Sequence, residues 1–259
     1  MLLVIDVGNT HTQLGVYDGN HLVKDWRIHT VSHTTEDELF VLLTGLIAGS
    51  RINPDGIDMS IISCVVPPMV TILDSFCRKY LKHDPLWVDA RSAHIMPIGY
   101  CNPAEVGADR IVNAVAAFHK YQTSLIVIDF GTATTFDVIS SKGAYLGGAI
   151  SPGVLISSEA LFMKTSKLPR VEIFAPPANV IGKDTASSIQ SGIIFGYASL
   201  VDGMVRRMID EMKTSPRIVA TGGLAQLMAD VCETIEVVDP TLTLEGLRII
   251  YEKIQATQK

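Results

Sequence analysis

The stretch that decides the fold occurs twice in the chain. Val4-Ile5-Asp6-Val7-Gly8-Asn9-Thr10 stands at the start of the sequence, and Val127-Ile128-Asp129-Phe130-Gly131-Thr132 repeats its outline at mid-chain. In both copies an apolar run ends in an aspartate, one apolar residue and a glycine, and hydroxyl-bearing residues come next. A second apolar stretch and a turn follow each copy, at residues 13–19 and 135–143. Internal similarity of this kind indicates a repeated structural unit.

Each copy predicts a buried strand followed by a tight turn that binds a ligand. The apolar run fits the strand, and the glycine lets backbone N–H groups point at a ligand. A carboxylate at the strand end is suited to a cation, and the N–H and hydroxyl groups after it are suited to phosphate oxygens. Two such turns would clamp one polyphosphate–metal complex between two half-domains. The alternative is an ordinary strand with an ordinary turn, which the repetition disfavours.

Composition bounds the class of protein. The 259 residues suffice for one large domain or two of ordinary size, and 47% hydrophobic with 19% charged residues is typical of an ordered globular chain. The formal net charge of −6, with scattered basic residues, disfavours a nucleic-acid or membrane surface. The sequence shows no signal peptide and no apolar run near the ~20 residues that span a bilayer. We therefore expect a cytoplasmic protein.

Several common catalytic and metal-binding patterns do not occur in the sequence. The four cysteines are far apart and lack CxxC spacing, and Cys64 and Cys77 fit buried thiols. The seven histidines form no HExxH pair and are typical of surface or loop positions. The sequence contains no GxxxxGK[ST], GxGxxG or GxSxG, which disfavours P-loop, dinucleotide and serine hydrolase sites.

The predicted elements alternate in two similar series. The first series has strands at residues 2–6, 11–17, 22–29, 59–66 and 86–88, and helices at 35–49, 67–81 and 105–120. The second has strands at residues 125–129, 134–139, 144–150, 217–220 and 235–238, and helices at 153–163, 187–213, 224–232 and 244–255. Thr35 and Glu38 predict a capping box at the first helix. Two similar α/β lobes, residues 1–120 and 121–259, are therefore predicted.

Two further turns are candidates for binding sites. Gly107-Ala108-Asp109-Arg110 lies in the first turn of the predicted helix 105–120. Asp109 there either stabilises the helix start or places a carboxylate at the mouth of the cleft between the lobes, and the residues leave both readings open. Thr221-Gly222-Gly223 ends a predicted strand, where open α/β sheets usually bind ligands, and its glycines allow close approach by a phosphate or a planar group.

Taken together, these motifs resemble a known superfamily. DxGNT at 6–10, DFGTATT at 129–135 and TGG at 221–223 are similar to the phosphate and adenosine motifs of acetate and sugar kinases, heat-shock ATPases and actin. Three features narrow the resemblance to type III pantothenate kinases: Tyr100-x-x-Pro103 leading to residues 106–110, the glycine-rich turn at 147–153, and Gly182-Lys183-Asp184-Thr185. The resemblance covers essentially the whole chain. It implies a duplicated, ribonuclease H-like, actin-like ATPase fold with the active site in the cleft between the lobes.

The resemblance also implies an ATP site with two kinds of cation. The ATP phosphates would be bound by the first turn, which comprises Asp6, Val7, Gly8, Asn9, Thr10, His11, Thr12 and Gln13. Asp6 would help to hold Mg²⁺, and Thr132 would contact ATP. Gly222 and Gly223 would belong to the adenosine motif. Asp129 would bind a monovalent cation, K⁺ or NH4⁺.

The implied acceptor is pantothenate, phosphorylated on its primary hydroxyl by ATP in the first step of coenzyme A synthesis. Asp109 would be the general base, and pantothenate would be bound by Tyr100, Gly107, Ala108, Asp109 and Arg110, with Arg110 facing its carboxylate. Thr185 would reach pantothenate from the partner subunit of a homodimer.

Three alternative functions stay open at this point. A kinase of the same fold with another alcohol substrate is disfavoured by the intact segment from Tyr100 to Arg110. A regulatory protein like the Bvg accessory factors is disfavoured by the retained Asp109 and Asp129 and by the acidic charge. A phosphatase of the same superfamily would need a carboxylate that activates water.

Overall fold

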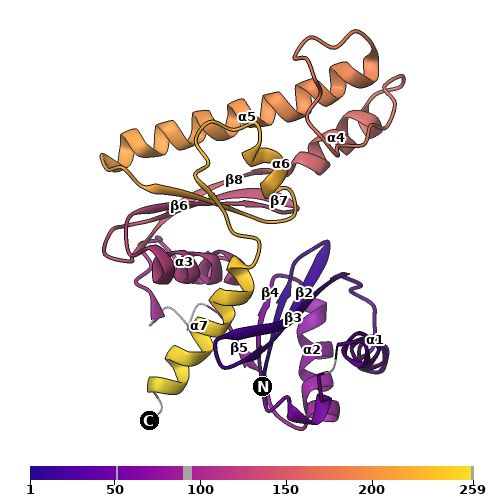
Figure 1. Ribbon diagram of the computed structural model, residues 1–259, viewed down its shortest axis with the longest axis vertical. Helices are drawn as coiled ribbons and strands as arrows, with labels where there is room; N and C mark the ends of the chain where they lie inside the picture. Colours follow the sequence, from indigo (N-terminus) through magenta and orange to yellow (C-terminus); the bar gives the residue numbers. More distant parts are fainter. Residues whose placement is uncertain (51, 90–94, 258–259) are drawn as a thin grey trace. The chain divides into compact units, whose positions relative to one another are not determined.

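The computed structural model describes residues 1–50, 52–89 and 95–257. The chain divides into two compact units (Figure 1). Unit 1 comprises Met1–Ala116 and the C-terminal segment from Leu242, and unit 2 comprises Ala117–Thr241. Each unit is built on a five-stranded sheet. None of the described helices combines the length and the apolarity needed to cross a bilayer.

The two sheets have the same topology. Unit 1 contains β1 (Leu2–Val7), β2 (His11–Asp18), β3 (His21–His29), β4 (Met59–Cys64) and β5 (Leu86–Trp87), in the order β3-β2-β1-β4-β5. Unit 2 contains β6 (Leu125–Phe130), β7 (Ala133–Ile139), β8 (Tyr145–Pro152), β9 (Arg217–Thr221) and β10 (Val237–Val238), in the order β8-β7-β6-β9-β10. In each sheet the first strand is antiparallel to the second and parallel to the fourth. The predicted α/β fold with two similar lobes is confirmed.

The alternation of side chains along β1 separates the two faces of the first sheet. Leu3, Ile5 and Val7 are buried in a core with α1 (Glu36–Ala48) and α2 (Pro67–Phe76). Residues 2, 4 and 6 point to the opposite face. That face receives α7 (Leu242–Thr257): a Cβ added to Gly15, the cross-strand partner of Val4, would lie 3.2 Å from the Leu244 side chain.

The place of α7 differs from the expected division at residue 120, which assigned the last helix to the second lobe. In the structure α7 contacts β1, β2 and β4 of unit 1. The boundary between the units lies within α3 (Ala108–Tyr121). Sequence order places consecutive elements together by default, so the return of a helix to the first unit is not visible from order alone.

The core of unit 2 lies between its sheet and three helices. These are α4 (Val154–Lys164), α5 (Thr185–Met212) and α6 (Ala225–Ala229). Ile126, Ile128 and Phe136 from β6 and β7 are fully buried against apolar residues of these helices. Figure 1 shows α5 running along one side of this sheet. The opposite face of the sheet therefore carries the alternate residues, which include Asp129.

Most predicted boundaries agree with the structure within a few residues. The capping box of α1 is confirmed, because Thr35 Oγ1 accepts the Glu38 N–H at 3.2 Å and Glu38 Oε2 accepts the Thr35 N–H at 2.8 Å. The helix predicted from Glu105 begins instead at Ala108. Pro103–Glu105 forms a separate 3-10 turn, η4, whose N-cap is Asn102. Two short elements, η1 (Pro54–Gly56) and the π-helical η2 (Cys77–Leu81), flank β4 and α2.

Candidate functional site

The turn between β1 and β2 is closed by a backbone hydrogen bond. The Gly8 N–H donates to the carbonyl oxygen of His11 at 3.0 Å, and a Cβ on Gly8 would lie only 3.1 Å from the same oxygen. The tightness of the turn therefore favours glycine at this position. Asn9 and Thr10, at the tip of the turn, are exposed, so their polar groups are accessible to a ligand.

Thr30, directly after β3, fixes the first turn in place. Its hydroxyl donates to the Gly8 carbonyl at 2.7 Å and lies 2.9 Å from the Thr12 hydroxyl. Its N–H donates to the Thr10 carbonyl at 3.0 Å. The sequence analysis missed Thr30, because its role depends on the pairing of β2 with β3. The only signal available was its place at the end of the predicted strand 22–29.

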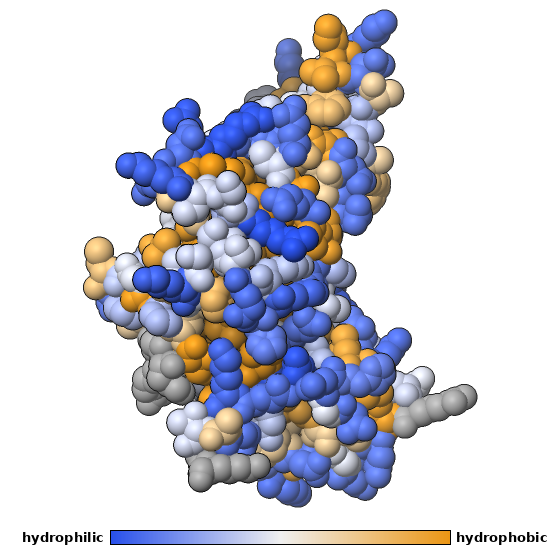
Figure 2. Space-filling view, turned by 60° about the vertical axis from the view of Figure 1, so that its left-hand side comes forward, coloured by the Kyte–Doolittle hydropathy of each residue, from blue (hydrophilic) through white to orange (hydrophobic). Residues whose placement is uncertain are grey.

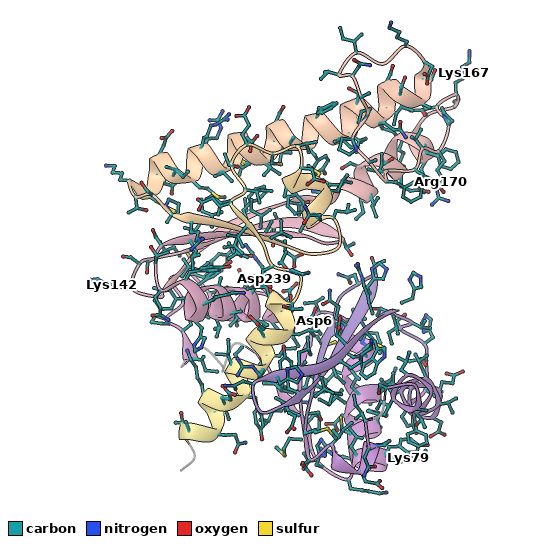
Figure 3. All side chains as sticks on the ribbon, in the orientation of Figure 1. Asp6, Lys79, Lys142, Lys167, Arg170 and Asp239 are labelled. Atoms are coloured by element: carbon teal, nitrogen blue, oxygen red, sulfur yellow. The ribbon has the colours of Figure 1, made fainter. Side chains whose placement is uncertain are left out.

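A row of polar residues crosses the first sheet beside this turn. Asp6 is paired with Gln13 on β2 and with Ser63 on β4, and Gln13 is paired with Arg27 on β3. Cross-strand partners point to the same face of a sheet, so these four side chains share the face opposite to α1 and α2. Asp6 is half-buried (Figure 3). Its carboxylate is placed to hold a cation at the end of β1.

His11, the first residue of β2, contacts two side chains of β3. An Arg27 Nη2 donates to His11 Nδ1 at 3.0 Å, and the His11 ring stacks on His29 with ring centroids 5.0 Å apart. Burial lowers the pKa of His11, and the charges of Arg27 and His29 lower it further. Since an arginine is always a donor, His11 accepts through Nδ1 and is neutral.

Asp109 occupies the first turn of α3. Its Oδ1 accepts the Arg110 N–H at 2.8 Å. Burial raises the pKa of Asp109, whereas the hydrogen bond and the positive charge of Arg110 oppose that rise. A Cβ on Gly107 would lie 2.5 Å from Asp109 Oδ1, so only glycine leaves room for this carboxylate position. A half-buried carboxylate with a raised pKa is a candidate general base.

The other residues that were predicted to bind pantothenate are near Asp109 in the sequence, and all of them belong to unit 1. Arg110 is buried with 6% of its surface exposed, and Tyr100, Gly107 and Ala108 are half-buried. Both helix-start stabilisation and catalysis agree with the position of Asp109.

The turn between β6 and β7 resembles the turn between β1 and β2, but its closing hydrogen bond encloses one residue instead of two. The Gly131 N–H donates to the Ala133 carbonyl at 3.1 Å. The Thr132 carbonyl accepts the Gly153 N–H at 3.1 Å, and a Cβ on Gly153 would lie 2.2 Å from that oxygen. Gly153, directly after β8, thus packs on the turn between β6 and β7. The rest of the predicted glycine-rich turn 147–153 is strand instead, because residues 147–152 pair with β7 as part of β8.

Asp129 and Gly222 are brought together in unit 2. Thr221 on β9 is paired with Asp129, and Gly222 follows with φ +93°. A Cβ on Gly222 would lie 2.4 Å from Asp129 Oδ1, so no other residue fits beside this carboxylate. Gly223 is exposed at the start of the connection to α6.

Thr185 is the first residue of α5 and is exposed. The helix is capped by Asp184, whose Oδ1 accepts the Ser187 N–H at 2.9 Å. This bond is the main reason for the lowered pKa of Asp184. A Cβ on Gly182 would lie 2.4 Å from the Ser188 nitrogen, which shows how closely residues before the helix pack on its first turn.

The predicted site residues therefore fall in both units. Asp6 to Gln13, Tyr100 and Gly107 to Arg110 belong to unit 1, and Asp129, Thr132, Thr185, Gly222 and Gly223 belong to unit 2. No group of three or more histidine, cysteine or acidic side chains within the described ranges is arranged to hold a metal. Mg²⁺ does not require such a group, because it is commonly bound by one or two carboxylates together with substrate phosphates. Asp6 is the carboxylate that fits this role.

Comparisons with known proteins identify relatives over the full length. A family model described as type III pantothenate kinase matches residues 2–207. A type III pantothenate kinase of Desulfatibacillum aliphaticivorans is 66% identical over 254 residues, which is 98% of this chain and 99% of the relative. Another, from Geobacter sulfurreducens, is 54% identical over 253 residues, or 98% and 99% of the two chains.

Solved structures share the fold at low identity. A candidate Baf family transcriptional activator from Campylobacter jejuni has a TM-score of 0.59 at 17% identity, with 98% of this chain and 99% of that chain covered. An activator of 2-hydroxyisocaproyl-CoA dehydratase from Clostridium difficile, solved with ADPNP, has a TM-score of 0.54 at 12% identity, with 99% and 96% covered. At these identities the likeness is one of fold.

Proposed function

Because the chain belongs to the type III pantothenate kinase family, we propose that it transfers the γ-phosphoryl group of ATP to pantothenate and forms 4′-phosphopantothenate and ADP. This reaction is the first step of coenzyme A biosynthesis. The observation that carries the proposal is the 66% identity to a pantothenate kinase over 98% of this chain. The raised pKa of the half-buried Asp109 carboxylate is a second observation that supports it.

Asp109 acts as the general base in this proposal. In its ionised form it accepts the proton of the pantothenate primary hydroxyl, whose oxygen forms a bond to the γ-phosphorus. The bond from that phosphorus to the β–γ bridging oxygen breaks, and ADP leaves. Burial keeps the carboxylate from being stabilised by water and so makes it a better proton acceptor. Arg110, buried beside it, supplies the positive charge for the pantothenate carboxylate.

The phosphate groups of ATP bind at the first turn in this proposal. Phosphoryl transfer asks mainly for positioning and for neutralisation of charge. The exposed Asn9 and Thr10 and the N–H groups of the turn supply donors, and Thr30 keeps the turn fixed. Mg²⁺ held near Asp6 would neutralise phosphate charge when it is bound. Thr132 and the Gly222-Gly223 turn contribute contacts to ATP, and Asp129 takes the monovalent cation.

The protein acts as a homodimer in this proposal. Unit 2 exposes large apolar side chains on and after α4, among them Met163 (70% exposed), Phe174 (79%) and Ile181 (81%). Figure 2 shows hydrophobic surface at the upper end of the molecule, where α4 and the N-terminal part of α5 lie. Exposed apolar surface of this kind marks an interaction site. A second copy would cover it close to Thr185, which follows Ile181 by four residues.

The decisive experiment measures ADP release with Mg-ATP and pantothenate, with and without K⁺. Wild type, Asp109→Asn and the matched control Asp210→Asn, an exposed position on α5, are compared. We expect pantothenate-dependent turnover that K⁺ stimulates in wild type and control and that collapses in Asp109→Asn. A folded wild type that binds ATP and shows no turnover with pantothenate would contradict the proposal and direct the search to other alcohols. The cytoplasmic location and the absence of nucleic-acid and membrane partners stay predictions from the sequence.

A further inference from the structure

The end of β3 is attached to the first phosphate turn. Thr30 bonds to Gly8 and Thr10 and lies beside Thr12, as described above. Arg27 and His29 are among the last three residues of β3. The hydrogen bonds of Thr30 therefore also fix their backbone relative to the turn. Both side chains point to the face of the sheet that carries Asp6 and Gln13, since Gln13 is paired with Arg27 and His11 with His29.

Arg27 carries a positive charge that no carboxylate of the described residues pairs with. Within the described residues its side chain forms no ion pair, and its hydrogen bond goes to the neutral His11. The side chain is exposed, and β3 is an edge strand of its sheet, so one flank of Arg27 is open. The chain has 27 acidic residues, and among those that the structure describes none forms an ion pair with this arginine.

His11 holds the guanidinium in one orientation. One N–H of Arg27 is bound to Nδ1, and stacking on His29 restrains the histidine ring. A guanidinium has five N–H donors in a rigid, planar fork that matches phosphate oxygens. Among the described residues the side chain of Arg27 has no other hydrogen bond, so its remaining N–H groups are available to a phosphate. Neighbouring strands are ~4.8 Å apart, so Arg27 lies two strands, or about 10 Å, from Asp6 along the same row.

We propose that Arg27 is a phosphate-binding residue of the ATP site, and that His11 positions its guanidinium. The inference rests on the proposed ATP site at the first turn. It adds a residue from β3, outside the segment Asp6 to Gln13. Arg27 and an Asp6-bound cation would then neutralise the polyphosphate from two ends of one polar row.

The binding of Mg-ATP at equilibrium tests the proposal, and this measurement does not require phosphoryl transfer to pantothenate. Isothermal titration calorimetry would give the Kd of Mg-ATP and of adenosine for wild type and Arg27→Gln. Lys24→Gln is the matched control, because it removes the same charge from the same strand at a position on the opposite face. We expect Arg27→Gln to weaken Mg-ATP binding about tenfold or more, as for the loss of a charge-assisted hydrogen bond. Adenosine binding and the behaviour of Lys24→Gln should stay as in wild type.

The positioning role of His11 is tested with a separate variant of that residue. His11→Phe keeps a flat ring that can stack on His29 and removes the acceptor for Arg27. We expect it to weaken Mg-ATP binding less than Arg27→Gln does, and the double variant to equal Arg27→Gln. Additive losses would overturn the coupling between the two residues.

Two outcomes overturn the assignment of Arg27. One is Mg-ATP binding by Arg27→Gln within about twofold of wild type, which is below the effect of a charged contact. The other is an equal loss of adenosine affinity, which would show general damage to the unit. Failure of the proposed function is distinguishable, because wild type would then bind Mg-ATP but release no ADP with pantothenate.

Discussion

At the scale of single residues, Asp109 combines burial with a negative charge. Burial of an ionised carboxylate costs free energy unless partners compensate for the lost water. The Arg110 N–H and guanidinium compensate only in part, because the net effect is still a raised pKa. In the proposed function, this cost in stability accompanies the role of Asp109 as the base.

Asp109→Asn tests this trade-off. We expect the kcat to fall about 10²–10⁴-fold, which is the usual contribution of a general base, with ATP affinity retained. We also expect a higher melting temperature at neutral pH, because the variant has no buried charge. Steady-state kinetics and thermal unfolding of the same samples measure both. A variant that lost activity and stability together would indicate a structural role instead.

The raised pKa of Asp109 also fixes the sign of two pH effects. Activity requires the ionised carboxylate, so kcat/KM should fall on the acid side at a higher pH than for an ordinary aspartate. As the pH falls, Asp109 is protonated at a higher pH in the folded state than in the unfolded state. The stability of wild type relative to Asp109→Asn should therefore rise as pH falls through the pKa of folded Asp109. A difference in stability that did not change with pH would contradict the assignment.

Gly107 is expected to position the base. In Gly107→Ala the added methyl group would lie 2.5 Å from Asp109 Oδ1, so the carboxylate must move. We expect the kcat to fall about tenfold to a hundredfold, since a shift of ~1 Å in a reacting group has that effect. Gly45→Ala is the control, because an added Cβ there meets no atom within 4 Å. Unchanged kcat in Gly107→Ala would show that this carboxylate position is not needed.

At the scale of secondary-structure elements, the first turn depends on the strand that packs beside it. Thr30→Val keeps the shape of the side chain and removes the hydroxyl bonded to Gly8 and Thr12. We expect a loss of about 1–2 kcal/mol in the free energy of unfolding, because a partly buried acceptor loses its donor. The KM for ATP should rise while the KM for pantothenate stays constant. Denaturant unfolding and steady-state kinetics measure these, and an unchanged KM for ATP would show that the turn holds its shape alone.

The contact between α7 and α3 requires a glycine. A Cβ on Gly246 would lie 2.3 Å from the Val112 carbonyl oxygen, which is backbone and has little freedom to move. Gly246→Ala should lower the free energy of unfolding by roughly 1–3 kcal/mol, the usual cost of overpacking. Gly192→Ala, in the open on α5, should instead leave stability equal or slightly higher. Chemical denaturation of both variants provides the comparison.

The elements that were predicted well are those with strong local signals. β1 and β6 are apolar runs that are followed by a glycine. Asp18-Gly19-Asn20 is typical of a tight hairpin, and Gly19 there has φ +55°. The start of α3 was misplaced, because Pro103 begins a separate turn and Gly107 separates it from the helix. Thr30 and Arg27 were not recognised because their contacts depend on strand pairing. The roles assigned through resemblance are not tested by the fold.

At the scale of the whole molecule, the exposed apolar surface of unit 2 predicts self-association. Phe174→Glu and Ile181→Glu place charges in that surface, and the matched control is Val41→Glu, an apolar residue of α1 that is 71% exposed. We expect wild type and control to sediment as dimers and the two unit 2 variants as monomers. The monomers should also bind pantothenate more weakly, since Thr185 would no longer be supplied by a partner. A wild type that is monomeric at assay concentration would contradict both expectations.

The discontinuous make-up of unit 1 has a consequence for how the protein is made. Synthesis proceeds from the N-terminus, and domains generally fold as units while they emerge. The sheet of unit 1 is complete in the chain once β5 has emerged, but the helix that covers one of its faces begins only at Leu242. The part of that face that α7 covers, around Val4 and Gly15, therefore stays uncovered while all of unit 2 is translated. We expect the nascent chain to need protection of that surface, by the ribosome or by chaperones, during this interval.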